Sequence, residues 1–323
     1  MMIRKLLVLT LPLLLYPLPL SSQEISKLPG KLPNSWLKAE NGLVINWVRA
    51  VSHRPSTSTV YIYENQGRLL VSLEVLPAVK EAKDVSIYDV SAMRGKLIAV
   101  SAVYGKEDAS NTIAATLLVF DFSGKLLSET ALDPARTALL LEIDENSHIW
   151  GLMTGAGEKD PSTSPVVTEY DATGVTVRTI LNWNSFPAHA KHIQQDPEHG
   201  PAAAGYNQGE FWFWLPGSTD LVVIRTSDGA VVTHAHTGLP NLAGAASKIW
   251  PLQLVRQSNG TLVGDFGTDA KQLLVFSWAP NTKQWGSRPI DHACAGARLI
   301  GSDENDSIFL RLTESNPVCR ARI

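Results

Sequence analysis

Cysteine is almost absent from this chain of 323 residues, which contains only Cys294 and Cys319. No Cys-x-x-Cys pair occurs, and this excludes a zinc site built on that motif. The even count suits an oxidising compartment, where the two thiols would pair and close a loop of about 26 residues. We expect this disulfide bond; two buried free thiols are the alternative.

Motifs of the common enzyme classes are missing as well. The chain has no Gly-x-Ser-x-Gly nucleophile elbow, no glycine-rich phosphate-binding loop and no His-Glu-x-x-His metal motif. No motif of a redox cofactor is found either. No activity can therefore be assigned from a motif.

Runs of like charge are also lacking. The chain has 28 Lys and Arg against 31 Asp and Glu, and two of the basic residues, Arg4 and Lys5, lie in the N-terminal leader, which leaves a net charge of −5 for the rest. A weakly acidic chain with mixed charges offers no basic patch to nucleic acid or to an anionic membrane. Neither is expected as a partner.

One long apolar run is present, from Leu6 to Leu20, and it follows Arg4 and Lys5 and ends at Ser21-Ser22-Gln23. The run is about 15 residues, shorter than the roughly 20 that a membrane span needs. Such a pattern is typical of a secretory signal peptide. We expect residues 1–23 to be a signal peptide and the protein to be secreted or periplasmic, with no membrane span. A retained membrane helix is the alternative.

Short runs of β-branched and aromatic residues dominate the rest of the chain, for example Thr116–Phe120 (TLLVF) and Leu221–Ile224 (LVVI). No stretch sustains helical periodicity over three turns. The pattern predicts an all-β protein.

Turn dipeptides separate these runs and fall into two alternating series. The first turn series consists of Asn41-Gly42, Arg94-Gly95, Glu145-Asn146, Gln208-Gly209, Asn259-Gly260 and Asn305-Asp306. The second turn series consists of Gln66-Gly67, Ser123-Gly124, Thr173-Gly174, Asp228-Gly229 and Pro280-Asn281. Two hairpins in about 50 residues make the four strands of a propeller blade. We predict a six-bladed β-propeller of four-stranded antiparallel blades, in one domain over residues 24–323. A large β-sandwich is the alternative.

The sixth unit lacks a fourth strand, because the sequence ends after the run Val318–Ile323. The stretch Glu24–Leu28 is left over before the first unit. We expect it to supply the missing strand, close the ring and remove exposed strand edges. A Cys294–Cys319 disulfide would fasten the same blade.

The repeated hairpin phrases YIYENQGRLL, VFDFSGKLLS and IRTSDGAVVT resemble the outer strands of six-bladed propellers of the NHL and TolB-like superfamily. The resemblance extends over the whole chain after the leader and implies an architecture. That superfamily includes binding proteins and lactone hydrolases, so the resemblance selects no activity. No catalytic residue of the superfamily can be matched here by motif.

The longest connections should gather on the face opposite both turn series, and binding sites often lie on such loops. These connections are residues 104–113, 153–165, 182–205 and 237–247. The third is the most unusual, because it contains His189, His192, Asp196, Glu198 and His199. His189 and His192 would both face a divalent metal, and His199 or Asp196 would complete the site. A solvated loop or a lid over the channel is the alternative.

Three carboxylates lie near the predicted innermost strands, Asp89, Glu142 and Asp265. In a propeller they would approach the central channel, where carboxylates from several blades are suitable ligands for calcium. A shared calcium site is therefore a further hypothesis.

The sequence leads to two functional hypotheses. The first is an exported, non-catalytic, monomeric propeller that binds a protein, peptide or glycan on the face of the long connections. The second is a metal-dependent hydrolase of the lactonase type, in which the carboxylates or the His189 cluster hold the ion.

Overall fold

The computed structural model describes residues 36–48, 58–65, 67–106, 113–155, 162–189, 191, 203–241, 249–268, 273–288, 298–302, 307–311 and 318–322. These residues form strands β1 to β23 and three short 3-10 helices, η1 (Leu76–Ala78), η2 (Pro134–Arg136) and η3 (Trp183–Ser185). The all-β prediction is confirmed.

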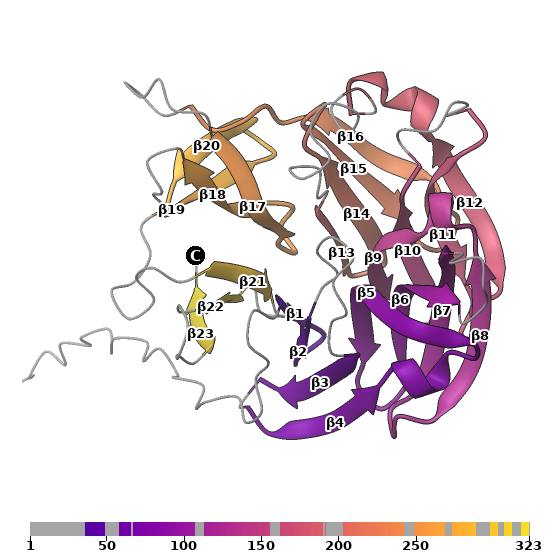
Figure 1. Cartoon of the computed structure of the whole chain (residues 1–323). Helices are drawn as coiled ribbons and strands as arrows, with labels where there is room; N and C mark the ends of the chain where they lie inside the picture. Colours follow the sequence, from indigo (N-terminus) through magenta and orange to yellow (C-terminus); the bar gives the residue numbers. More distant parts are fainter. Residues whose placement is uncertain are drawn as a thin grey trace, which may run out of the picture.

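Consecutive groups of four antiparallel strands form the blades of a β-propeller (Figure 1). One blade contains β5 (Ala82–Met93), β6 (Leu97–Lys106), β7 (Ile113–Asp121) and β8 (Leu126–Leu132). The next contains β9 (Ala138–Ile143), β10 (Ile149–Met153), β11 (Pro165–Tyr170) and β12 (Thr176–Asn182). The following two contain β13 (Ala203–Asn207), β14 (Glu210–Leu215), β15 (Asp220–Arg225) and β16 (Val231–His236), and then β17 (Ile249–Arg256), β18 (Leu262–Thr268), β19 (Leu273–Ala279) and β20 (Gln284–Ser287).

The remaining strands share one sheet. It contains the first blade, with β1 (Trp36–Glu40), β2 (Leu43–Trp47), β3 (Thr59–Glu64) and β4 (Leu69–Glu74), and also β21 (Arg298–Ser302), β22 (Ser307–Arg311) and β23 (Val318–Arg322). The link is a parallel pairing of Ala39 on β1 with Gly301 on β21.

The described strands therefore form five sheets, and the prediction of six blades is wrong. The physical reason is the close approach at Gly301, where an added Cβ would lie 1.9 Å from the carbonyl oxygen of Ala39. Only glycine allows the two backbones to come close enough to pair. The sixth unit thus extends the first blade instead of standing as a separate sheet.

Two other predictions about the chain ends fall on residues outside the described part. Glu24–Leu28, expected to close the ring, lies there, as does Cys294; for Cys319, on β23, only the backbone is described. Ring closure by an N-terminal strand and the disulfide bond remain predictions.

Two hairpins of the second turn series, at Ser123-Gly124 and Thr173-Gly174, have the same chemistry. Asp121 Oδ1 accepts hydrogen bonds from the backbone N–H groups of Ser123 (2.9 Å) and Lys125 (3.0 Å), and Asp171 does the same for Thr173 and Val175. Hydrogen bonds from the following hydroxyl and backbone groups lower the pKa of both carboxyls. In these two hairpins the repeated phrase is therefore a turn built on a carboxylate, which positions two strands of its blade.

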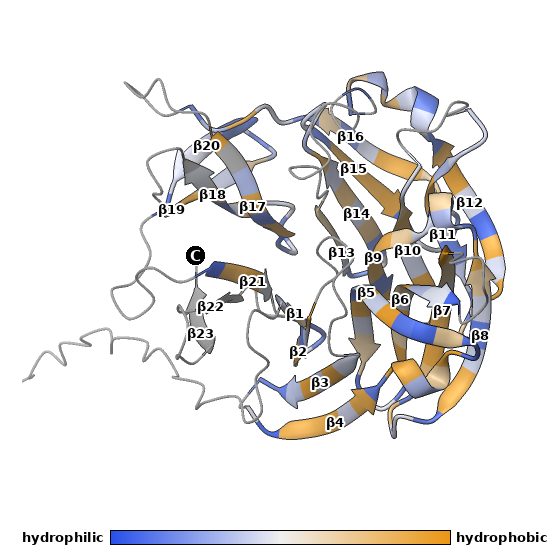
Figure 2. Ribbon diagram, in the orientation of Figure 1, coloured by the Kyte–Doolittle hydropathy of each residue, from blue (hydrophilic) through white to orange (hydrophobic). Residues whose placement is uncertain are grey.

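Both faces of a blade are buried against its neighbours. On β14, Phe211 and Phe213 pack in one cluster with Trp150 of the preceding blade, whereas Trp212 and Trp214 pack in another with Trp278 of the following blade. Figure 2 shows the corresponding hydrophobic colouring along β14 and β15. Alternation along the strand sends successive side chains to opposite faces, so this aromatic run fastens three blades together.

The innermost strands surround the central channel in chain order. β5 contacts β9, β9 contacts β13, β13 contacts β17, β17 contacts β21, and β21 pairs with β1 (Figure 1). Side chains from these strands therefore meet in the channel although they are about 50 residues apart in sequence.

Candidate functional site

The central channel contains a cavity of about 940 Å³. Four turns of the first series contribute to its lining, through residues that include Asn41, Arg94, Glu145 and Gln208. We call it the central cavity, and it lies at the face of the propeller that carries these turns. A volume of this size is within the range of small-molecule sites.

A second, much smaller cavity of about 50 Å³ lies further along the channel. Its lining includes Trp36, Trp47 and Pro251, on the innermost strands or the strand beside them. Lys38 and Glu142 line both cavities. They therefore form part of the partition between the two ends of the channel.

Lys38, on β1, is the centre of a charged cluster in this partition. Its Nζ atom lies 2.7 Å from Glu40 Oε2, 2.9 Å from Glu142 Oε1 and 3.5 Å from Asp89 Oδ2. It also donates a hydrogen bond of 2.6 Å to the carbonyl oxygen of Leu141. An ammonium group thus occupies a cage of four oxygens contributed by β1, β5 and β9.

The cluster changes the acid–base properties of its members. Burial by itself would lower the pKa of Lys38, but the charges of Asp89, Glu142 and Glu40 outweigh it and hold that pKa well above its usual range. Burial, together with the charges of Glu40 and Asp89, raises the pKa of Glu142 well above its ordinary value, and Lys38 offsets only part of this effect. Glu142 therefore retains its proton to higher pH than an exposed glutamate does.

Two carboxylates of the cluster also connect neighbouring blades. Glu40 Oε1 on β1 accepts a hydrogen bond of 2.7 Å from Ala92 N on β5, and Asp89 Oδ2 on β5 accepts one of 2.7 Å from Leu141 N on β9. Each carboxylate satisfies a backbone donor of the next blade, which would be costly to bury without a partner. These carboxylates thus stabilise the contacts between neighbouring blades of the ring.

Asp265, the third predicted calcium ligand, belongs to a different contact between blades. It lies on β18 and receives hydrogen bonds from Arg298 Nε (2.8 Å) and Leu299 N (3.4 Å) on β21. Burial raises the pKa of Asp265, and Arg298 opposes this shift. The structure therefore brings Asp89 and Glu142 together around Lys38 and places Asp265 against Arg298. Within the described residues, no three His, Cys, Asp or Glu side chains are arranged to hold a metal ion.

His189 is the one member of the predicted histidine cluster that falls in the described part of the chain. It is buried, its ring stacks on Trp183 with centroids 5.3 Å apart, and its Nδ1 accepts a hydrogen bond of 3.4 Å from Gly217 N. The ring thus serves packing at the end of η3. His192, Asp196 and His199 lie outside the described residues, so their metal site remains a prediction.

The other side of the central cavity is lined mainly by neutral polar side chains, with Arg256 of β17, which pairs with Glu210, as a charged exception. Tyr206 and Asn207 come from β13, Gln208 from the turn that follows it, and Gln253 from β17. A side-chain amide offers both donors and an acceptor. This side of the cavity can therefore match a ligand that has hydrogen-bonding groups of both kinds.

Sequence reasoning identified Asp89 and Glu142 but missed Lys38, Glu40 and the amides. A signal for the first two does exist: Lys38 and Glu40 alternate on the strand just before the turn Asn41-Gly42, so both point to one side. The amides have no comparable signal, because neutral polar residues are common on any surface.

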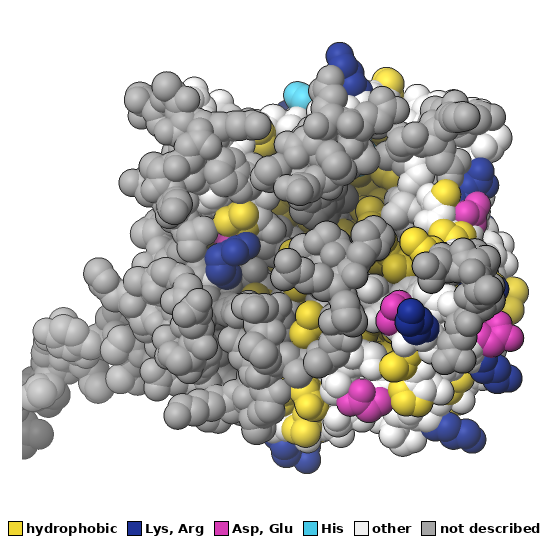
Figure 3. Space-filling view, viewed as in Figure 1, with side chains coloured by type: hydrophobic (Ala, Val, Ile, Leu, Met, Phe, Trp, Pro, Cys, Tyr) yellow, Lys and Arg dark blue, Asp and Glu magenta, His cyan; other side chains and the backbone are white. Residues whose placement is uncertain are grey.

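Charges on the visible face of the molecule are mixed. Figure 3 shows Lys and Arg side chains interspersed with Asp and Glu among the described residues of that face. In the part of the chain that is described, no helix has the length and hydropathy needed to cross a membrane. About half of the residues in the long connections, where the sequence placed a ligand, lie outside the described part of the chain, so a site on that face remains a prediction.

Comparison with known proteins finds similar solved structures but no family. No family model matches the chain, and no curated protein matches it. Among solved structures, the chain is similar to a periplasmic gluconolactonase of Pseudomonas aeruginosa, with a TM-score of 0.45 and 13% identity over 88% of this chain and 83% of the other. A luciferin-regenerating enzyme gives a TM-score of 0.46 and 11% identity over 88% and 89%, respectively.

A β-propeller domain of Cps50 (Swd1) from Myceliophteria thermophila gives a TM-score of 0.45 and 9% identity over 92% of this chain and 99% of the other. These proteins differ from one another in function and are all distant from this chain. No family match supports the resemblance to the NHL and TolB-like superfamily. The propeller architecture is shown by the sheet topology.

Proposed function

We propose that this chain is an exported, non-catalytic, monomeric propeller that binds a polar ligand in the central cavity. This places the ligand at the face of the first turn series, opposite the long connections. The observation that carries the proposal is the lining of the central cavity of about 940 Å³. Lys38, Glu40 and Glu142 bind one another there, and side-chain amides such as Gln208 and Gln253 line the same space.

The Lys38 cluster is the reason for ranking binding above hydrolysis. A hydrolase of the lactonase type would need a divalent ion among the channel carboxylates to activate water or polarise a carbonyl. Here the Lys38 ammonium lies between Glu40 and Glu142 and contacts Asp89 at 3.5 Å. The same oxygens would have to release Lys38 before they could bind an ion.

Export is part of the proposal and depends on residues 1–23. The protein should be purified from the medium or the periplasm of an expressing host, and its mass measured. Loss of 22 or 23 residues is the expected result. A chain that keeps its first 23 residues and sediments with membranes would contradict it.

The binding proposal is tested with a defined panel of probes. Tri- to hexasaccharides of glucose and of N-acetylglucosamine, and peptides of the same lengths, are titrated against the full exported chain by calorimetry. For any probe that binds, Gln253→Ala should weaken the affinity by about tenfold, which corresponds to the loss of one good hydrogen-bonding group. Gln284→Ala, at an exposed position on β20, is the matched control and should leave the affinity unchanged.

Two results would overturn the proposal. One is a bound probe whose affinity Gln253→Ala does not change. The other is one tightly bound divalent ion per chain by elemental analysis, with ester or lactone hydrolysis that is lost on chelation. The second result would instead establish the hydrolase.

A further inference from the structure

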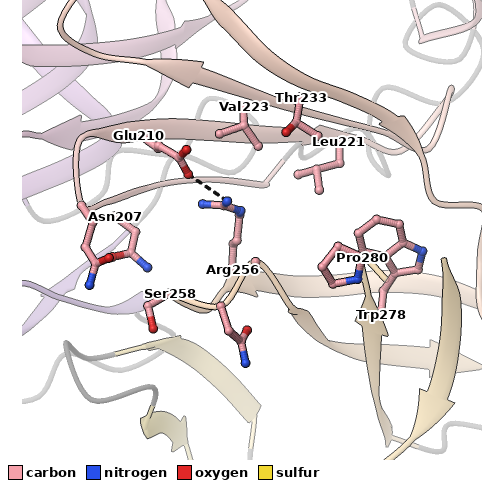
Figure 4. A pocket seen from close by; sticks show the side chains of 12 residues that line it. Asn207, Glu210, Leu221, Val223, Thr233, Arg256, Ser258, Trp278 and Pro280 are labelled. Atoms are coloured by element: carbon pink, nitrogen blue, oxygen red, sulfur yellow. Dashed lines mark ion pairs between the residues drawn. The ribbon is translucent and has the colours of Figure 1, made fainter. Parts of the chain in front are cut away.

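A third cavity, of about 430 Å³, lies between two blades, beside the central cavity (Figure 4). One wall comes from β14, β15 and β16, and the other from β17, β19 and the turns next to them. We call it the side pocket. Three of its lining residues, Leu221, Val223 and Trp278, belong to the core cluster between the two blades.

The side pocket and the central cavity share part of their lining. Asn207, Gln208 and Arg256 contribute to both. An elongated ligand in the central cavity can therefore continue into the side pocket between the blades.

The side pocket has an apolar floor and a polar rim. Leu221, Val223 and Trp278 line it and are each no more than 2% exposed, so they form its deep part. Thr233 and Asn259 line it and are exposed, so they lie at the rim. An apolar group that reaches the floor is removed from water, and the polar rim can bind whatever carries that group.

A charged pair marks the junction between the two cavities. Arg256 Nη2 lies 2.8 Å from Glu210 Oε2, and the two side chains face each other across the space in Figure 4. Because the pair is already neutral as a whole, the junction selects for a neutral polar segment more than for a charged one.

These features fit a peptide better than a sugar. A peptide group has one N–H and one C=O, and the side-chain amides at the rim offer the complementary acceptor and donors. A sugar stacks on the broad face of an aromatic ring, but the ring of Trp278, the aromatic residue in this lining, is packed in the core between the two blades. The side pocket suits a single apolar side chain with a polar backbone above it.

We propose that the side pocket binds one apolar side chain of an extended peptide whose main chain continues into the central cavity. This inference rests on the proposed function and narrows its ligand to a peptide segment. The peptide has at least one large apolar residue and is otherwise neutral where it crosses the junction of Arg256 and Glu210.

The test begins with a random dodecapeptide library displayed on phage and selected on the full exported chain. A synthetic peptide of the selected sequence is then titrated by fluorescence anisotropy against three proteins: the natural chain, Thr233→Trp and Thr179→Trp. Thr233 lines the side pocket, and a tryptophan there fills it. Thr179 is an exposed threonine at the matching outer strand of the preceding blade and is the control.

The expected result is a shared apolar position in the selected peptides. Replacing that residue by alanine should weaken binding by about tenfold or more, and Thr233→Trp should weaken it by a similar factor, with Thr179→Trp unchanged. If Thr233→Trp fails to fold, as judged by its melting temperature, the alanine peptide alone decides the question on the natural chain.

The remaining outcomes separate the two proposals. Suppose that Gln253→Ala abolishes binding of the selected peptide, but neither Thr233→Trp nor alanine at the peptide's apolar position changes it. The peptide then lies in the central cavity only, and this inference is wrong. Binding of an oligosaccharide that Gln253→Ala weakens, with no peptide selected, also overturns this inference and leaves the binding function standing. A peptide insensitive to both Thr233→Trp and Gln253→Ala contradicts both proposals.

Discussion

The two sides of the central channel differ in what their polar side chains do. On the side of β1, β5 and β9, Lys38, Glu40, Asp89 and Glu142 bind one another or the backbone of the next blade. On the side of β13 and β17, Gln208 and Gln253 line the central cavity, which Lys38, Glu40 and Glu142 border from the other side. The charged cluster around Lys38 therefore maintains the ring, and the side of β13 and β17, where Arg256 is paired with Glu210, is the one suited to a ligand. A series of substitutions can test this division.

Lys38→Met should have the largest effect. It leaves the carboxylates of Glu40 and Glu142 buried without their cation, and breaking a buried ion pair in this way costs about 3–5 kcal/mol. Equilibrium unfolding in urea measures the loss. Lys125→Met, at an exposed turn, is the control and should stay within about 0.5 kcal/mol of the natural chain. Equal stability of Lys38→Met and the control would show that the cluster does not hold the ring.

Gly301→Ala tests the pairing of β21 with β1, which joins the two sides of the channel. The added Cβ would collide with a backbone carbonyl of β1, so we expect a cost near the upper end of about 1–3 kcal/mol for overpacking. Gly286→Ala is the matched control, because nothing lies within 4 Å of its added Cβ. Thermal unfolding should separate the two variants clearly; coincident melting curves would mean that the pairing of β1 with β21 contributes little.

Asp89→Ala and Gln253→Ala compare the two sides directly. Asp89→Ala leaves the buried Leu141 N–H without its acceptor, at a cost of about 1–3 kcal/mol, although it removes no ligand contact under our proposal. Gln253→Ala should change the unfolding free energy by less than about 0.5 kcal/mol while weakening the ligand. If the effects on stability were reversed, the assignment of the two sides would be wrong.

Glu142→Gln should have the smallest effect on stability, and that effect should be seen only in how the melting temperature depends on pH. Because the pKa of Glu142 is raised above its ordinary value of 4.5, the folded chain binds more protons than the unfolded chain above that pH, so its contribution to stability falls as the pH rises from 4.5 toward the raised pKa. The amide does not titrate and should flatten this fall. Melting temperatures between about pH 4.5 and 8 provide the measurement.

The control for this experiment is Glu145→Gln, an exposed carboxylate that lines the same cavity. It should leave the slope of melting temperature against pH as it is in the natural chain. Identical slopes for the natural chain and Glu142→Gln would remove Glu142 as the source of the pH dependence.

The local structure could be predicted from the sequence because it depends on local chemistry. Turns such as Ser123-Gly124 and Thr173-Gly174 are set by a preceding aspartate and a glycine with positive φ, and both are visible in the sequence. The number of blades could not be predicted in the same way. It depends on one contact, between Ala39 and Gly301, which lie near opposite ends of the chain.

The site was predictable only where it is charged. Asp89 and Glu142 are noticed as carboxylates near inner strands, but their pairing with Lys38 is seen only when three blades are assembled around it. The amides at Gln208 and Gln253 carry no pattern at all. Whether they face the channel depends on the register of β13 and β17, including the irregularity between Pro251 and Gln253.

The pairing of Ala39 with Gly301 also sets an order of events during biosynthesis. β1 is among the first strands to leave the ribosome, but β21, its parallel neighbour, follows more than 250 residues later. At the usual elongation rates of about 5–20 residues per second, this delay is on the order of tens of seconds. Throughout that time β1 has β2 beside it but not β21, and an unpaired strand edge can associate with another chain. Nascent chains that end before Arg298 should therefore be the form of this protein most prone to aggregate.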